Sequence, residues 1–112
     1  MEIIDVKTAE LTENPHDVKA SKLYDTQNAQ VAHITLEPGE SLKKHITPVD
    51  VFFTVLEGKG VVEIGDEKKE IGKDTLVNSP AKIPHYWYNE SGAVLRFLEV
   101  KVPCPKESTK LL

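Results

Sequence analysis

The sequence is poor in sulfur and has no long apolar run. Its single cysteine, Cys104, cannot form an internal disulfide, and without a cysteine pair there is no thiolate cluster for a structural zinc ion. No hydrophobic stretch approaches the roughly 20 residues that a membrane span requires, and the acidic N-terminal stretch lacks the apolar segment of a signal peptide. We therefore expect a cytoplasmic protein with no membrane partner.

Positive charge is also scarce. Lysine and arginine number 14 against 18 aspartate and glutamate residues, so the net charge is -4 and no general cationic field exists to attract a phosphate backbone. The sequence has no glycine-rich phosphate loop, no serine at a strand-to-helix elbow and no basic stripe interleaved with aromatic residues. Kinase, hydrolase and nucleic-acid-binding functions therefore lack support.

The length and the residue types favour a single all-β domain. A chain of 112 residues can build one modest core, and its 12 valines, seven isoleucines and eight threonines favour strands. A helical turn is expected near Thr8, and Pro15 ends any extension of it. Alternation of apolar and polar residues predicts strands at 31–36, 51–56, 61–64, 75–77, 86–88 and 94–102, with additions at 3–6 and 18–24. Many short strands separated by turns predict a β-sandwich or a barrel.

Two stretches of the chain carry the most information about function. Residues 39–58 have the sequence GESLKKHITPVDVFFTVLEG, and residues 72–89 have the sequence GKDTLVNSPAKIPHYWYN. Together they resemble the two sequence motifs of the cupin family. The residues that match these motifs at the right spacing are Gly39, His45 and Gly58 in the first and Pro80, His85 and Asn89 in the second.

The resemblance implies a fold and a domain organisation. A cupin is a double-stranded β-helix, also called a jelly-roll barrel, and we expect roughly eight to ten short strands in a single domain over residues 1–112. The barrel core is expected at about 18–102, after an N-terminal strand and loop at 1–17 and before a C-terminal tail at 103–112. The resemblance also implies that two copies pair as a homodimer.

The sequence departs from the family motifs at positions that matter for metal binding. Thr47 stands where the family has its second histidine, and Val51 stands at the glutamate position. Lys82 replaces a family glycine, and the gap from Gly72 to Pro80 is two residues longer than in the family pattern. The inference of the fold survives these changes, because glycine-punctuated strands carry it, whereas the inference of a metal site is weakened.

The family arrangement places the site inside the barrel, around His45 and His85. Alternation along the strands then predicts a pocket that is completed by Thr47, Val51, Phe53, Trp87 and Asn89. In that pocket the two aromatic side chains are either flat walls for a sugar ring or a small aromatic acid, or simply part of the core. The threonine hydroxyl and the asparagine amide would orient a ligand.

His45 and His85 are the candidate metal ligands and the candidate catalytic residues. A bulge near Pro48 would turn Asp50 inward and complete a set of two histidines and one carboxylate, whereas simple strand alternation points Asp50 to solvent. With zinc, iron, manganese or nickel bound, the protein would be an enzyme acting on a small carboxylate, carbonyl or sugar substrate. Without a metal, the buried imidazoles would act as general bases, or the cavity would bind or sense a small molecule without turnover.

Other residues with reactive or aromatic side chains are assigned simpler roles. His16 lies in a polar loop and is expected at the solvated surface, and His33 is expected to have a structural role on the outer face of its strand. Cys104 lies between two prolines with no histidine nearby, which disfavours a nucleophilic role. Tyr86 and Tyr88 alternate with the inward-facing residues, so they are expected on the outer face, where they suggest a dimer surface.

Overall fold

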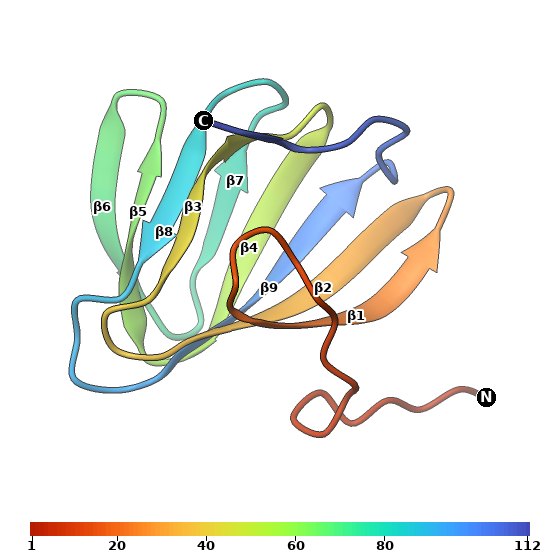
Figure 1. Ribbon diagram of the computed structural model, residues 1–112, viewed down its shortest axis with the longest axis horizontal. Coiled ribbons are helices and arrows are strands. Elements are labelled where there is room, and N and C mark those ends of the chain that lie inside the picture. Colours follow the sequence, from red (N-terminus) through yellow and green to blue (C-terminus); the bar gives the residue numbers. More distant parts are fainter.

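The chain forms two five-stranded antiparallel sheets that face each other, as the computed structural model of all 112 residues shows (Figure 1). The first sheet contains, in spatial order, β1 (Lys19–Thr26), β2 (Ala29–Leu36), β9 (Leu95–Val102), β4 (Asp50–Glu57) and β7 (Leu76–Ser79). The second contains β10 (Lys110–Leu111), β3 (Ser41–Ile46), β8 (His85–Tyr88), β5 (Lys59–Ile64) and β6 (Glu67–Gly72). The ten strands confirm the expectation of an all-β fold, and no helix is long and apolar enough to cross a membrane.

The chain passes from one sheet to the other at most of its connections. Strands β3, β5, β6 and β8 belong to one sheet, and β4, β7 and β9, which lie among them in the sequence, belong to the other. Strands far apart in the sequence therefore lie side by side within each sheet. His45 on β3, for example, is directly paired with His85 on β8.

The inner faces of the two sheets form an apolar core at one end of the sandwich. Phe53, Trp87 and Phe97 are fully buried there. The Trp87 ring stacks on Phe97 with 4.6 Å between centroids, and Phe53 packs edge-on against both rings. Such aromatic contacts add to the stabilisation from burial alone. This end of the sandwich therefore supplies a rigid base for the polar groups beyond it.

Three parts of the chain differ from the expectations drawn from the sequence. Residues 3–6 do not form a strand, because they extend away from the sheets with Ile3 and Ile4 exposed and have no partner strand to pair with. The turn near the N-terminus closes at Thr8, whose amide donates to the Asp5 carbonyl oxygen, so no helical turn begins there. β6 was not predicted, because its sequence EKKEIG lacks apolar alternation, yet it pairs with β5 as a charged edge strand.

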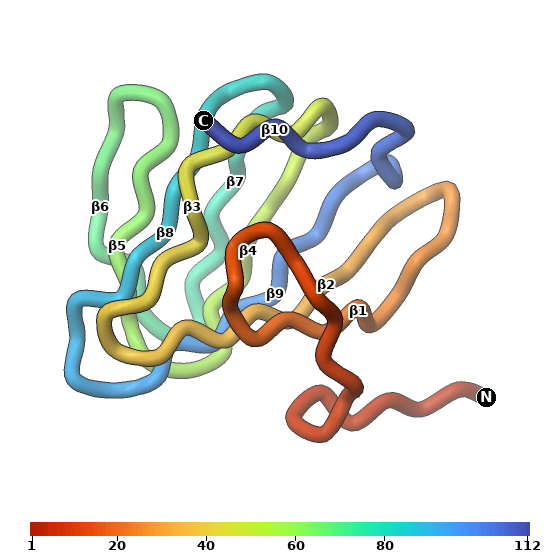
Figure 2. Tube along the Cα trace, viewed as in Figure 1, coloured from red at the N-terminus to blue at the C-terminus, as the bar shows by residue number.

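A loop near the N-terminus and a short strand near the C-terminus are attached to the sandwich. The N-terminal loop is held by the Thr12 amide, which donates to Ala20, and by Lys43, whose ammonium donates to the Pro15 carbonyl oxygen. In Figure 1 this loop crosses in front of β4, β9 and β2. The C-terminal strand β10 pairs with the end of β3 (Figure 2). The N-terminal loop and Thr109, which precedes β10, cover the cavity described below.

The turn between β4 and β5 yields a prediction about stability. Gly58 adopts φ of +77°, and a Cβ built there would overlap the carbonyl oxygen of Val94, whereas Gly39, with φ of +89°, has open space around it. Gly39→Ala should cost roughly 1 to 2 kcal/mol from backbone strain alone. Gly58→Ala should cost about 2 kcal/mol more, because backbone must move to relieve the overlap. Urea unfolding of both variants tests this, and equal losses would show that the close approach of Val94 does not constrain the fold.

Candidate functional site

Two histidines and one glutamate meet inside the sandwich. His45 and His85 are paired across β3 and β8, and their Nε2 atoms lie 2.7 Å apart. Glu99 comes from β9 in the facing sheet, and its Oε2 lies 3.9 Å from the His45 Nε2. All three side chains are buried, and one ligand atom from each lies within 4.8 Å of the other two. The structure thus brings the two predicted histidines together and adds a carboxylate.

The His45 ring is held in one protonation state. Its Nδ1 lies 2.6 Å from the carbonyl oxygen of Lys43, which can only accept a hydrogen bond, so Nδ1 carries the proton. Burial lowers the pKa of His45, although the Lys43 carbonyl and Glu99 oppose this shift. The neutral ring therefore directs the lone pair of Nε2 toward His85 and Glu99.

The His85 ring has hydroxyl partners that fit either of its tautomers. Ser79 Oγ lies 2.8 Å from Nδ1, and Thr47 Oγ1 lies 3.5 Å from Nε2. A hydroxyl both donates and accepts, so Ser79 can satisfy Nδ1 with or without its proton. Burial, and then the charge that His45 carries when it is protonated, lower the pKa of His85 to about 3. His85 is therefore neutral near pH 7, and Ser79 allows its Nε2 to expose either a proton or a lone pair.

Glu99 was not among the residues predicted from the sequence. Its carboxylate accepts no hydrogen bond from the protein although the residue is only 8% exposed, and its nearest cation is the Lys101 ammonium, 3.8 Å from Oε1. A signal was present, because alternation along 94–102 places Glu99 on the same face as Leu95 and Phe97. Glu99 lies outside both sequence motifs, so the motifs do not indicate it as a site residue.

Asp50 does not join this cluster. Its side chain is at the surface, where Oδ1 accepts a hydrogen bond of 2.8 Å from the Ala81 amide. Val51, at the position of the family glutamate, is buried in the apolar core. The carboxylate near the histidines therefore comes from β9 instead of from β4, its neighbour in the same sheet.

The cluster opens into a cavity of about 330 Å³ between the sheets and the N-terminal loop. The cavity is lined by Thr12, Glu13, Asn14, Pro15, His16, Ala20, Ser21, Lys22, Gln30, Ala32, Ile34, Leu42, His45, Glu99, Lys101 and Thr109. Both sheets, the N-terminal loop and the C-terminal tail thus contribute to its wall. Such a volume fits a small molecule.

His16 is part of this cavity, so the expectation of a solvated surface histidine is wrong. Its ring packs edge-on against His45 with 4.8 Å between centroids, and its Nδ1 is buried without a hydrogen-bond partner. Burial, then His45 when it is protonated, and then the positive charges of Lys43 and Lys101 lower its pKa to about 4. The hydrogen bonds that hold the N-terminal loop place this ring over the cluster, which alternation along strands could not predict.

The residues predicted to line a pocket lie in three different surroundings. Thr47 is buried beside His85, as described above. Phe53 and Trp87 are fully buried in the aromatic core and do not line the 330 Å³ cavity. Asn89 holds a turn, because its amide donates to the carbonyl oxygens of Leu36 and Ala93.

The remaining candidates have structural surroundings. His33 lies on the outer face of β2, where its Nε2 accepts a hydrogen bond of 3.1 Å from Arg96, as expected for a structural histidine. Burial and the neighbouring Asp25 raise the pKa of the Cys104 thiol, which disfavours the reactive thiolate. The Tyr86 and Tyr88 rings lie 5.0 Å apart on the outer face of β8. Pairing of two copies through that face stays a prediction.

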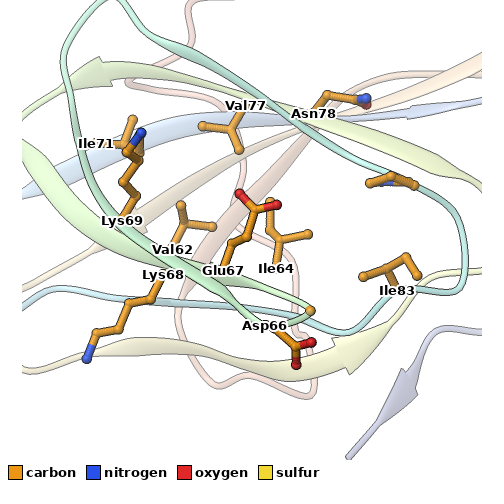
Figure 3. A pocket seen from close by; sticks show the side chains of 12 residues that line it. Val62, Ile64, Asp66, Glu67, Lys68, Lys69, Ile71, Val77, Asn78 and Ile83 are labelled. Atoms are coloured by element: carbon orange, nitrogen blue, oxygen red, sulfur yellow. The ribbon is translucent and has the colours of Figure 1, made fainter.

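A second, larger cavity of about 680 Å³ lies between the β5–β6 hairpin and β7 (Figure 3). Its apolar wall includes Val62, Ile71 and Val77, and charged side chains of β6 project beside it. It contains no histidine, and the structure's one group of potential metal ligands lies in the other cavity. We therefore place the candidate site at the smaller cavity.

Solved structures share this architecture. A structure of the protein TT1209 from Thermus thermophilus is similar with a TM-score of 0.81 and 29% identity, covering 94% of this chain and 100% of that one. The polyketide cyclase RemF from Streptomyces resistomycificus has a TM-score of 0.85 over 100% of this chain and 85% of its own. Its identity is 20%, so this likeness concerns the fold.

The sequence comparisons lead to the same family. The uncharacterized protein MJ0764 of Methanocaldococcus jannaschii is 29% identical over 87 residues, which are 77% of this chain and 75% of that protein. Its crystal structure, that of an RmlC-like cupin with a double-stranded β-helix fold, has a TM-score of 0.76 and covers 94% of this chain and 96% of that one, at 25% identity. The cupin-domain family model matches residues 32–101. The chain therefore belongs to the cupin family, and its fold is the double-stranded β-helix.

Proposed function

We propose that this cupin is a divalent-metal-dependent enzyme that acts on a small carboxylate, carbonyl or sugar substrate in the 330 Å³ cavity. The observation that carries the proposal is the meeting of His45, His85 and Glu99, of which His45 and Glu99 line the cavity. Two imidazoles and one carboxylate are the protein ligands of many catalytic zinc and non-haem iron sites. Asp50, the carboxylate considered from the sequence, has no part in this proposal.

The donor atoms present fit a divalent cation. The Glu99 carboxylate is buried without a hydrogen-bond donor and has only the Lys101 ammonium, at 3.8 Å, to compensate its charge, so a divalent cation in the cluster would add to that compensation. His45 directs a lone pair from Nε2 into the cluster, and His85 does the same when its Nδ1 proton is donated to Ser79. A cation held by these three side chains would supply Lewis acidity, polarising a substrate oxygen.

The rest of the site orients the ligands and limits the access of water. The Lys43 carbonyl and the Ser79 hydroxyl hold the two imidazole rings from behind, which is how a second layer of residues orients metal-binding histidines. The N-terminal loop and Thr109 cover the cavity, so that polar interactions inside it are stronger than in open solvent. His16, neutral at pH 7, adds one hydrogen-bond donor and one acceptor to the cavity wall.

One of the structurally similar proteins is an enzyme. RemF is a polyketide cyclase, and its fold superimposes on the whole of this chain. This supports the proposal of catalysis only at the level of the scaffold, because one fold hosts many activities. The substrate class proposed for this protein therefore rests on its own cavity.

A competing function is a metal-free module that binds or senses a small molecule. The observation that favours it is the 2.7 Å contact between the two Nε2 atoms, since one protonated Nε2 would donate to the other and satisfy both rings without a metal. Thr47 and Val51 also stand at two positions where the cupin motif has ligands. Metal binding distinguishes the two functions directly.

The proposed function predicts which carboxylate binds the metal. After resupply of zinc, iron, manganese or nickel, untagged protein should retain about one ion per chain. His45→Ala, His85→Ala and Glu99→Gln should each weaken binding roughly tenfold or more, because each removes a donor. Asp50→Asn is the matched control and should bind normally, since its carboxylate caps the Ala81 amide elsewhere.

Elemental analysis after dialysis measures this, with circular dichroism confirming that each variant is folded. Loss of metal from Asp50→Asn with normal binding by Glu99→Gln would refute the assignment. Substoichiometric metal in the parent protein after every resupply would refute the metal-dependent function and favour the metal-free module, for which native mass spectrometry would then identify the ligand.

The second prediction concerns protons released on metal binding. Two ordinary histidines, with a pKa near 6.5, would together carry about 1.5 protons at pH 6. A metal ion that binds both rings would displace these protons into the buffer. Burial lowers the pKa of His45 and brings the pKa of His85 to about 3, so at pH 6 fewer protons are bound in the folded protein. Calorimetric titration with zinc, in buffers of different ionisation enthalpy, should therefore show release well below 1.5 protons. Release of the full amount would contradict the neutral, buried pair.

A further inference from the structure

Lys101 places a positive charge in the wall of the candidate cavity. It lies two residues after Glu99 on β9, on the same face of the strand, and its side chain is only 15% exposed. Its ammonium donates no hydrogen bond within the protein, and its nearest anion is Glu99, at 3.8 Å. Glu99 is thus the one anion that compensates this mostly buried ammonium, and if Glu99 binds a cation instead, a bound anion would replace it as the partner of Lys101.

The other lysine that lines the cavity already has a partner. Lys22 is about half exposed, and its ammonium lies 3.5 Å from Oδ2 of Asp25, three residues along β1. Lys43, which holds the N-terminal loop, donates to the Pro15 carbonyl oxygen. Lys101 differs from both, because its partner Glu99 is itself a proposed metal ligand, so a bound cation would leave the Lys101 ammonium available to a molecule inside the cavity.

The charges of the site favour an anion over a neutral ligand. Lys101 is one of the charges that lower the pKa of His16, His45 and His85, so its field reaches the whole cluster. Glu99 offsets one positive charge in the metal-free protein. If Glu99 instead binds a divalent cation, as in the proposed function, the cation and Lys101 leave an excess of two positive charges in a water-poor cavity, where such charges act strongly.

Part of the cavity wall is apolar. It consists of Ala20, Ala32 and Ile34, from the same sheet as Lys101, and of Leu42, from the facing sheet. At about 330 Å³ the cavity is at the small end of the range for ligand sites. Its wall therefore suits a ligand with one anionic group and a short hydrocarbon or aromatic part.

We propose that the cavity binds a small organic acid, with the carboxylate on the Lys101 ammonium and the apolar part against Ile34 and Leu42. This inference deepens the proposed function, whose cavity it shares, by naming the charged group of the ligand. His16 covers the acid from the N-terminal loop and offers it an uncharged hydrogen-bond partner. Lys101 is a binding residue in this account, and the metal ligands remain His45, His85 and Glu99.

Matched pairs of acids and amides test the proposal. Benzoate with benzamide, and isobutyrate with isobutyramide, differ in charge but hardly in shape. Calorimetry on the zinc-loaded protein should show binding of at least one acid, with its amide weaker by about tenfold or more, as expected for the loss of a charge-assisted contact. The variant Lys101→Met should bind the acid more weakly by the same factor, and it should bind the amide with unchanged affinity.

Lys22→Met is the matched control, because it removes a lysine from the same cavity whose charge is already paired, and it should keep the affinity of the parent protein. Zinc content is measured on every sample, so failure to hold metal is seen separately from failure to bind the acid. Repeating the titration after chelation should show weaker but still Lys101-dependent binding. Absence of binding by both acids, equal affinity for the amides, or full acid affinity in Lys101→Met would each overturn the proposal.

Discussion

The close approach of His45 and His85 is the interaction on which the site depends. Direct pairing across β3 and β8 puts their Nε2 atoms 2.7 Å apart inside the sandwich. Burial keeps both rings neutral, so the approach brings no repulsion between charges. Each ring has a partner behind it, the Lys43 carbonyl or the Ser79 hydroxyl, and these partners decide which nitrogen faces the cluster.

The interior of the barrel changes from apolar to polar along its length, and this gradient explains where the site lies. Along the inner face of β9, Leu95 and Phe97 belong to the core, Glu99 reaches the histidines, and Lys101 lines the cavity. The aromatic core gives the base of the site a rigid packing, and the N-terminal loop closes its other side. The proposed metal ligands, the lysine proposed to bind an anion and the N-terminal loop are thus successive layers of one fold.

The motifs in the sequence were enough to predict the fold and the meeting of the two histidines, because spacing between glycine-punctuated strands determines which residues are paired. They do not point to Glu99, which lies on β9 outside both motifs, although alternation along 94–102 places it on the inner face together with Leu95 and Phe97. His16 was missed for a different reason. A loop has no periodicity, and only hydrogen bonds such as that from Lys43 to Pro15 determine where its side chains point.

A crystal structure of the metal-loaded protein, with anomalous diffraction recorded at the absorption edge of the metal, tests the central claim most directly. The account predicts one anomalous peak within bonding distance of Nε2 of His45, Nε2 of His85 and the carboxylate of Glu99. Protein crystallised from excess metal with no peak there, and with the two Nε2 atoms still in direct contact, would contradict it.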